Sequence, residues 1–408
     1  MYIHCRKMND MNCLRMKHLL VSLLLCALML PAQSQNSYTI DMRPFADAAH
    51  HWYDIFEKEN IINPKKNQPR YKPTEIEAVA DNVLLYQKNN GGWPKNYDIL
   101  AILEPAQKDS LLNAKDILNT TFDNGTTWTH VECLAQVYTA THVEKYKTAC
   151  LKGIDFILTS QYGNGGWPQY YPLKKDYSKY ITYNDDVFMG IIGMLKRITD
   201  GQAHFSFLDE AYRKKLKKAY AKGLDCILAT QIDDAGKPTA WCQQYDEKTL
   251  QPAWARTFEP PSICNGESAE VVMLLMSIEK PTTKIIDAIQ NAVAWFDTSK
   301  ILDTKVQTIK APTDTTKFTI SHTDKVVVND PNAPPIWTRY YELQTHRPLF
   351  CNRERKIVYS LAEVERERRD GYGWYTYSPQ KVLNYYKKWQ AIYAPTNNVL
   401  EKSILNKN

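Results

Sequence analysis

The sequence predicts an all-α fold, an incomplete α/α toroid built from repeated helix pairs, with a small strand-containing region near the C-terminus. Two observations support this prediction. Three amphipathic segments end on a glutamine, and each is followed by a Gly-containing turn, a tryptophan and a second helical segment. The glutamines are Gln87, Gln161 and Gln231, and the tryptophans are Trp93, Trp167 and Trp241.

The N-terminus has the pattern of a secretory signal peptide. Lys17 precedes an apolar run, and small residues follow at Ala32 and Ser34, where we expect cleavage. Residues 1–34 would then be removed, residues 35–408 would form one domain, and the protein would be secreted or periplasmic. No later apolar run approaches the ~18 residues that cross a bilayer.

Charge and cysteine content exclude several classes of protein. The net charge is +6, of which the residues before 35 contribute +3, and the remainder is too small to indicate nucleic-acid binding. The six later cysteines lack C-x-x-C metal spacing, so we expect buried free thiols with one bridge at most. Motifs of serine hydrolases, zinc proteases and nucleotide-binding loops are absent from the sequence.

The two helices of each repeat have distinct signals. Apolar residues of the first helix recur at three- and four-residue steps, which gives one buried face; these helices are expected at 75–87, 146–161 and 216–231. The second helix begins with polar residues whose oxygens can accept free backbone N–H groups; these helices are expected at 122–140, 183–198 and 264–278. Stacked pairs of this kind share one continuous core.

The turn between the two helices is repeated as NNGGWP and GNGGWP. Glycine permits the tight turn, and proline prevents helical continuation. The tryptophan has two interpretations, which the sequence leaves open. The ring either covers the helix ends as a structural residue, or Trp93 or Trp167 stacks on a sugar.

After residue 300 the pattern changes. Residues 305–312, 317–323 and 325–330 alternate or are β-branched and predict short strands. Residues 361–375 and 379–393 are expected to be helical. We interpret about 300–360 as a strand-bearing segment inserted before the last helices.

Polar clusters begin each second helix and would meet on one rim. They are Asp123 and Asn124, then Asn184, Asp185 and Asp186, then Asn265 and Glu267. Carboxylate and amide oxygens are hard ligands that suit Ca²⁺. The alternative is that these residues only cap the helices.

Arginines form a second group of candidates. Arg256 lies in a Pro-rich loop, where it either takes part in the chemistry of the site or forms an ordinary ion pair with Glu259 or Glu267. A later cluster contains Arg339 and Arg347, and arginine binds carboxylates through two parallel hydrogen bonds. Acids that bind a cation, together with several arginines, indicate a polymer of carboxylated sugars as the ligand.

Six ordered motifs resemble polysaccharide lyase family 10, the pectate lyases. The resemblance covers about residues 75 to 376. The motifs are NNGGWPKNYD, FDNGTTWTHVECLA, NGGWPQYYP, YITYNDDVF, ARTFEPPSICNGES and RYYELQTHRPLF. It implies a secreted, calcium-dependent lyase that cleaves polygalacturonate or pectin by β-elimination and leaves a 4,5-unsaturated sugar.

The resemblance also implies roles for individual residues. Arg256 would be the base, and the uronate carboxylate would be bound by Arg339 or Arg347, between which we do not choose. Lys179 is a further basic candidate for substrate contact. Calcium ligands would be Asp123 and Asn124 from the first cluster and Asp185 and Asp186 from the second. We expect a monomer.

Two other classes of function are weighed against this one. The turns match the Gln-x-x-x-Gly-x-Trp pattern of α/α-barrel terpenoid cyclases, but the acidic motif of those enzymes is absent from the sequence. A non-catalytic binder of acidic polysaccharide could keep the same fold. His130, on a helix face, is expected to be structural.

Overall fold

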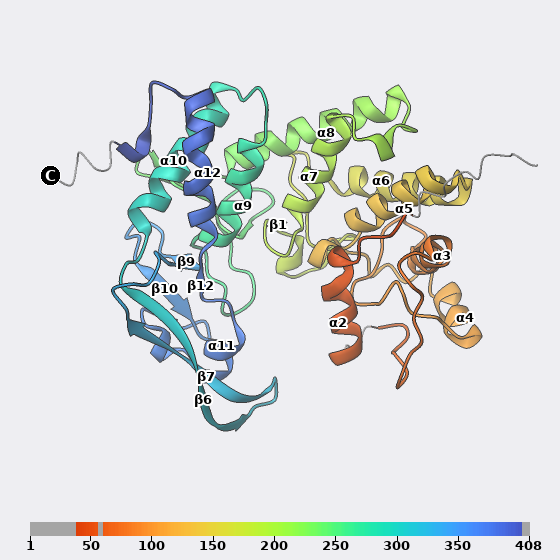
Figure 1. Cartoon of the computed structure of the whole chain (residues 1–408), viewed down its shortest axis with the longest axis horizontal. Helices are drawn as coiled ribbons and strands as arrows, with labels where there is room; N and C mark the ends of the chain where they lie inside the picture. Colours follow the sequence, from red (N-terminus) through yellow and green to blue (C-terminus); the bar gives the residue numbers. More distant parts are fainter. Residues whose placement is uncertain (1–37, 56–59, 402–408) are drawn as a thin grey trace, which may run out of the picture. The chain divides into compact units, whose positions relative to one another are not determined.

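The computed structural model describes residues 38–55 and 60–401, and the chain from Ile40 onward forms one compact unit. The expected signal peptide lies outside these residues. Within the described part, no helix is long and apolar enough to cross a membrane. The unit is mainly helical with some strands, as Figure 1 shows.

The α-helices are α2 (Ala46–Asp54), α3 (Ile76–Tyr86), α4 (Pro105–Asn113), α5 (Trp128–Thr141), α6 (Glu144–Ser160), α7 (Phe188–Thr199), α8 (Glu210–Ala229), α9 (Asn265–Met276), α10 (Thr283–Ser299), α11 (Arg366–Gly371) and α12 (Ser378–Tyr393). The strands are β1 (Ile181–Thr182), β2 (Asp233–Asp234), β3 (Lys237–Pro238), β4 (Gln244–Tyr245), β5 (Ile263–Cys264), β6 (Thr304–Thr315), β7 (Ile320–Asn329), β8 (Trp337–Thr338), β9 (Tyr340–Tyr341), β10 (Pro348–Cys351), β11 (Ile357–Val358) and β12 (Tyr375–Thr376).

The main helices pack in two rows. One row contains α3, α6, α8 and α10, and the other contains α5, α7, α9 and α12, with each helix contacting the next in its row. The rows also pack on one another, through α3 with α5, α5 with α6, α7 with α8, and α10 with α9 and α12. The six helices expected from the repeat are therefore present, and they bury one continuous core.

Each turn of the repeat is held by the same hydrogen bonds. The side-chain nitrogen of Gln87 donates to the carbonyl oxygens of Gly91 and Ala149, both at 2.9 Å. Gln161 and Gln231 make the corresponding bonds in the next two turns. The glutamine thus joins its own turn to the next helix of the first row.

The tryptophans are repeated in the same way. Trp93 Nε1 donates to the carbonyl of Val83, ten residues earlier, at 2.8 Å. Trp167 and Trp241 donate to Ile157 and Ile227 at 2.9 and 2.8 Å. All three rings are fully buried, so they close the ends of the helices that precede them.

A fourth copy of the repeat is present, which the sequence analysis did not predict. Trp337 is fully buried, and its Nε1 donates to the carbonyl of Phe296 in α10 at 3.0 Å. Trp337 pairs with Thr376, a residue of the strand that precedes α12. In the first repeat, Trp93 is bound in a similar way, because its carbonyl accepts from the backbone N–H of Thr121, which precedes α5. The long β6–β7 hairpin is inserted between α10 and this tryptophan, which hides the spacing.

The C-terminal region contains the expected strands, with two differences. The second and third expected strands join into the single strand β7, because residues from both of them pair with β6 across the hairpin, with one register shift between Lys310 and Asp314. The helix expected over 361–375 is interrupted: a 3₁₀ turn at Leu361–Glu363 is followed by α11 and then by β12, which pairs with β8. A four-stranded sheet of order β11-β10-β9-β5 connects this region to α9.

The six cysteines in the described part are all free and buried. This agrees with the expectation of buried thiols and leaves no bridge among them. Burial of these small apolar side chains contributes to the core rather than to metal binding.

Candidate active site

Two loops of the repeat meet beside the starts of α5 and α7. The first, Asp123–Thr127, precedes α5, and the second, Asn184–Asp186, precedes α7. The amide of Gly125 donates to the carbonyl of Asp185 at 3.4 Å, and the indole of Trp128 donates to the carbonyl of Asp186 at 3.0 Å. The repeat therefore brings together acidic residues that are 62 positions apart in the sequence.

The backbone of both loops is strained. Asn124, Thr127, Asp185 and Asp186 have φ angles of 51°, 74°, 55° and 55°. This left-handed region is unfavourable for residues with a Cβ atom, above all for β-branched threonine. Strain of this kind persists only where the surrounding structure enforces it, and it is frequent at functional sites.

Asp123 is buried and has two polar partners. Its Oδ2 forms an ion pair with Lys95 Nζ at 2.8 Å, and its Oδ1 accepts from Gln169 Nε2 at 2.7 Å. Lys95 and Gln169 each lie two residues after a repeat tryptophan, at equivalent positions of successive turns. The two turns thus orient one carboxylate.

Asp185 lies close to several charged groups. Burial raises its pKa, the negative charge of Asp123 raises it further, and the nearby Arg256 opposes the shift, so that the pKa reaches about 7. Asn184 Nδ2 donates to Asp185 Oδ2 at 2.6 Å. Two carboxylates that repel each other in a partly buried site are a favourable place for a cation.

Arg256 is paired with a buried glutamate. Its Nη2 donates to Glu259 Oε1 at 2.6 Å, and its backbone N–H donates to Glu259 Oε2 at 3.0 Å. Its side chain is 42% exposed, whereas that of Glu259 is 1% exposed. Burial alone lowers the pKa of Arg256, but the hydrogen bond and charge of Glu259 outweigh this effect and raise it. The arginine is therefore a firmly protonated cation in the free protein, and of the two ion pairs that the sequence left open it forms the one with Glu259.

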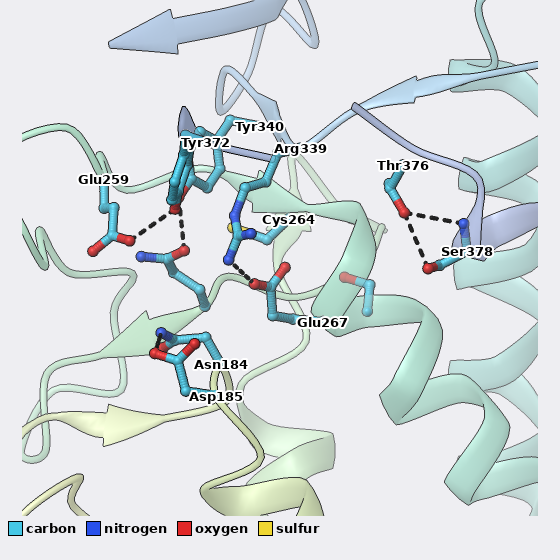
Figure 2. Close-up of polar contacts among 12 residues, drawn as sticks. Asn184, Asp185, Glu259, Cys264, Glu267, Arg339, Tyr340, Tyr372, Thr376 and Ser378 are labelled. Atoms are coloured by element: carbon cyan, nitrogen blue, oxygen red, sulfur yellow. Dashed lines mark hydrogen bonds and ion pairs between the residues drawn. The ribbon is translucent and has the colours of Figure 1, made fainter. Parts of the chain in front are cut away.

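The two candidate substrate arginines lie in different surroundings. Arg339 Nη2 forms an ion pair with the buried Glu267 at 2.5 Å, and its charge also acts on Asp185 and Glu259. Figure 2 shows Arg339 beside Tyr372 and directed at Glu267, with Asp185 below them on a separate loop. Arg347 is exposed and stacks on Tyr359, with 3.7 Å between Cζ and the ring centre. Arg339 therefore belongs to one charged cluster with Asp123, Asp185 and Arg256. No described contact links Arg347 to this cluster.

The third polar cluster of the sequence has a structural role in this chain. Asn265 donates to the carbonyl of Thr338 and accepts from the indole of Trp295. Glu267 holds Arg339. Neither residue lies in a strained loop, because β5 leads directly into α9.

The structure contradicts sugar stacking by Trp93 and Trp167. Both rings are fully buried, and stacking on a sugar requires an open face. The structural interpretation of the two rings is the one that fits. His130 is structural too: it is buried against Trp93, and burial lowers its pKa to about 3.

Lys179 and Tyr177 belong to one short 3₁₀ turn, Tyr177–Lys179. Lys179 Nζ is 3.4 Å from Glu247 and beside the ring of Tyr180. Tyr177 is half-buried, and burial raises the pKa of its hydroxyl. The charge of Arg256 lowers this pKa, whereas the charges of Glu259 and Asp123 raise it. Charges of both the acidic loop and the Arg256 loop therefore act on Tyr177, which no motif indicated.

No group of three or more His, Cys, Asp or Glu side chains that could hold a metal ion occurs among the described residues. The residues nevertheless fit a calcium ion on one observation, the repulsion between Asp123 and Asp185 that raises the pKa of Asp185. A calcium ion at this point would need further oxygen ligands, such as backbone carbonyls, water or a ligand carboxylate.

Comparison with known proteins identifies the family. The family model described as pectic acid lyase matches residues 87–383. A family 10 polysaccharide lyase from Cellvibrio cellulosa is similar in structure, with 30% identity and a TM-score of 0.63, over 78% of this chain and 95% of that one. A variant of a family 10 lyase from the same organism, in complex with trigalacturonic acid, has 29% identity and a TM-score of 0.63, over 78% of this chain and 96% of that one.

A comparison with curated proteins gives no match. The family match nevertheless covers most of the chain and includes the acidic loops and both arginines of the cluster. The chain therefore belongs to the pectic acid lyase family and is a pectate lyase.

Proposed function

We propose that this enzyme is a calcium-dependent lyase that cleaves polygalacturonate by β-elimination and leaves 4,5-unsaturated oligogalacturonides. The observation that carries the proposal is the grouping of two carboxylates, Asp123 and Asp185, with two guanidinium groups, Arg256 and Arg339. An acidic ligand that binds together with a cation makes use of all four. The complex of a similar lyase with trigalacturonic acid supports the same class of ligand.

Asp123 and Asp185 are the main proposed calcium ligands. Asn124 and Asp186, the next residues in the two loops, are proposed as further ligands. Calcium, when bound, stabilises negative charge on a uronate carboxylate and so acidifies the neighbouring C5 proton. Lys95 and Gln169 orient Asp123, and Asn184 orients Asp185. Partners of this kind fix the direction in which ligand oxygens point.

Arg339 is the proposed partner of the uronate carboxylate. Its Nη2 is engaged by Glu267, and its buried Nε has no hydrogen-bond partner among the described residues. The Arg339 side chain is nevertheless 22% exposed, and a substrate carboxylate could accept hydrogen bonds from the exposed part of its guanidinium group. Arg347, which stacks on Tyr359, is not proposed for this role, and Lys179 is proposed to contact a neighbouring uronate.

Arg256 is the proposed base that removes the C5 proton. Glu259 keeps it protonated in the free enzyme, so it must lose a proton before it can act. The positive charge of Arg339 nearby disfavours a second cation and promotes this loss. Activity should therefore rise towards alkaline pH, where more of the enzyme carries a neutral Arg256.

The chain's architecture and location complete the proposal. The two rows of helices are proposed to form an incomplete α/α toroid. Residues 1–34 are proposed to be a signal peptide cleaved near Ser34, so that the enzyme acts as a secreted or periplasmic monomer.

The direct test is an assay on polygalacturonate that follows the ultraviolet absorbance of unsaturated uronides. We expect a rising signal with calcium and none after chelation. The alternative, a non-catalytic binder of acidic polysaccharide, predicts binding of oligogalacturonate without that signal. Activity that is the same in chelator would contradict the proposed role of calcium.

A further inference from the structure

The Arg256–Glu259 pair is continued by a chain of buried hydroxyl groups. Tyr372 OH donates to Glu259 Oε1 at 2.8 Å. The hydroxyl oxygens of Tyr372 and Tyr340 are 2.7 Å apart, and Tyr340 OH lies 2.8 Å from Gln243 Oε1. Figure 2 shows the two tyrosine side chains together, with the Tyr372 hydroxyl directed at Glu259. Residues from four segments of the chain thus converge on the carboxylate that holds Arg256.

A count of hydrogens fixes the direction of this chain. Three contacts join Gln243, Tyr340, Tyr372 and Glu259, and each needs one hydrogen, but the two phenols supply only two. Glu259 is an acceptor only, because its hydrogen bonds with Arg256 and Tyr372 outweigh burial and lower its pKa. The third hydrogen must therefore come from the other end, from the amide of Gln243.

Gln243 can supply that hydrogen. The side chain is fully buried, and its Nε2 has no hydrogen-bond partner among the described residues, although buried amide nitrogens are rarely left unpaired. Rotation of the amide by a half turn exchanges its oxygen and nitrogen. The N–H then faces Tyr340, the Tyr340 hydroxyl donates to Tyr372, and the Tyr372 hydroxyl donates to Glu259.

Tyr372 also contacts both arginines of the cluster. The Arg339 Cζ atom is 4.9 Å from the centre of the Tyr372 ring, and that of Arg256 is 6.0 Å away. The ring therefore lies beside both guanidinium groups, while its hydroxyl donates to the carboxylate that binds one of them. Donor chains that run in one direction strengthen each bond in turn.

We propose that Tyr372 is a positioning residue of the elimination, and that Gln243, Tyr340 and Tyr372 form a one-way chain of donors that ends on Glu259 and holds the Arg256 guanidinium in its reactive position. The inference rests on the proposed role of Arg256. None of these three residues needs to touch the substrate.

The test compares two single Tyr→Phe variants, their double variant and a matched control in the full-length enzyme. Tyr372→Phe should lower kcat about 10- to 100-fold with little change in KM, because small displacements of a reacting group have effects of this size. Tyr340→Phe removes the donor to Tyr372 but keeps the bond to Glu259, so its effect should be smaller. The double variant should be no worse than Tyr372→Phe alone, since Tyr340 acts only through Tyr372.

Tyr341→Phe is the matched control. Tyr341 follows Tyr340 in β9, is equally buried, and donates to a backbone carbonyl, that of Ser299, at 2.7 Å. Loss of the Tyr341 hydroxyl should lower the melting temperature as much as Tyr372→Phe or Tyr340→Phe does, while kcat stays within about twofold of the wild type. Melting curves and binding of oligogalacturonate show whether each variant is folded.

The outcomes separate the two proposals. A wild-type enzyme without unsaturated product would overturn the proposed function, and this inference with it. An active wild type with a Tyr372→Phe variant that matches Tyr341→Phe in kcat would overturn the inference alone. If Tyr372→Phe does not fold, a folded Tyr340→Phe variant with the kcat of the control would overturn the inference instead. If all variants fold, a double variant whose loss of kcat equals the product of the two single losses would also overturn it.

Discussion

The Gly-Trp turns and the acidic loops face the same backbone requirement and meet it with different residues. Both regions need left-handed conformations. The turns place glycine there, Gly91 and Gly165, with φ angles of 92° and 97°. An added Cβ at these two positions would lie 2.3 and 2.0 Å from the carbonyl oxygens of Lys152 and Lys222. The acidic loops instead place asparagine, threonine and aspartate in left-handed positions.

The difference separates structure from chemistry within one repeat. A left-handed residue with a Cβ costs about 1–2 kcal/mol relative to glycine. The turns avoid that cost because they need no side chain at those positions. The loops accept it, and the side chains of Asp185 and its neighbours are the ones proposed to bind calcium. The repeat therefore provides a regular frame, and the strained loops on it carry the side chains of the proposed calcium site.

The sharpest test of this separation is Asp185→Ala, which should abolish lyase activity while leaving the fold intact. Removal of the side chain removes a proposed calcium ligand and also relieves its repulsion with Asp123. The melting temperature in chelator should therefore stay the same or rise. Turnover of polygalacturonate and thermal melting measure the two effects. The control is Asp225→Asn, at an exposed position on α8, and an active Asp185→Ala enzyme would refute the assignment.

Arg256→Lys should remove most turnover, about 100-fold or more, the usual range for loss of a positioned acid–base group. Lysine keeps the charge but loses the planar guanidinium group, whose Nη2 donates to Glu259. The variant should fold and bind oligogalacturonate. Arg369→Lys, at an arginine paired with Asp324 outside the site, is the control. Turnover near the wild-type level with an unchanged pH profile would reduce Arg256 to a charged contact.

Trp167→Ala tests the other side of the comparison and should reduce stability without a specific effect on substrate. Emptying a fully buried aromatic site costs about 3–5 kcal/mol, and the Nε1 bond to Ile157 is lost as well. Denaturant unfolding measures the change, and KM of the folded fraction should not move. Tyr385→Ala, at an exposed aromatic on α12, gives the baseline. An increase in KM with unchanged stability would restore the sugar-stacking interpretation.

The smallest expected effect is a pH dependence of calcium stabilisation. The pKa of Asp185 is about 7 in the folded protein, above its ordinary value. The calcium-free fold therefore binds more protons than the unfolded chain in this range and loses stability as pH rises towards and through 7. Calcium binds the ionised form, so it should raise the melting temperature more at about pH 8 than at about pH 5.5. Asp185→Asn should remove most of this difference, and an equal shift at both pH values would contradict it.

The repeat, its helices and the acidic loops could be predicted from the sequence because each leaves a local signal. Periodic apolar residues mark the helices, and the Gln-Gly-Trp turn marks their ends. The fourth copy could not be predicted, because the β6–β7 hairpin separates Trp337 from the helix to which it belongs. Exposure of the tryptophans could not be predicted either, since the same turn is compatible with a buried ring and with an open one.

The site was predicted in part for the same reason. Asp123, Asp185 and Arg256 stand in motifs with a characteristic order, and Glu259 follows Arg256 within one turn. Tyr372 and Gln243 have no local signal, because their contacts join residues far apart in the chain. Tyr372 and Glu259 are separated by 113 positions. Such partners become visible only when the helix rows and the C-terminal strands are packed together.

The inserted hairpin has a consequence for engineering. β6 and β7 leave the helical frame after α10 and return before Trp337, whose bond to Phe296 has the same form as in the other three repeats. Large parts of the hairpin are exposed, including Phe318 and Ile320 near its tip. The turn of this repeat thus tolerates a long guest segment without disturbing its host. It is a natural attachment point for a reporter or a carbohydrate-binding module, fused at a position where the enzyme already carries an addition.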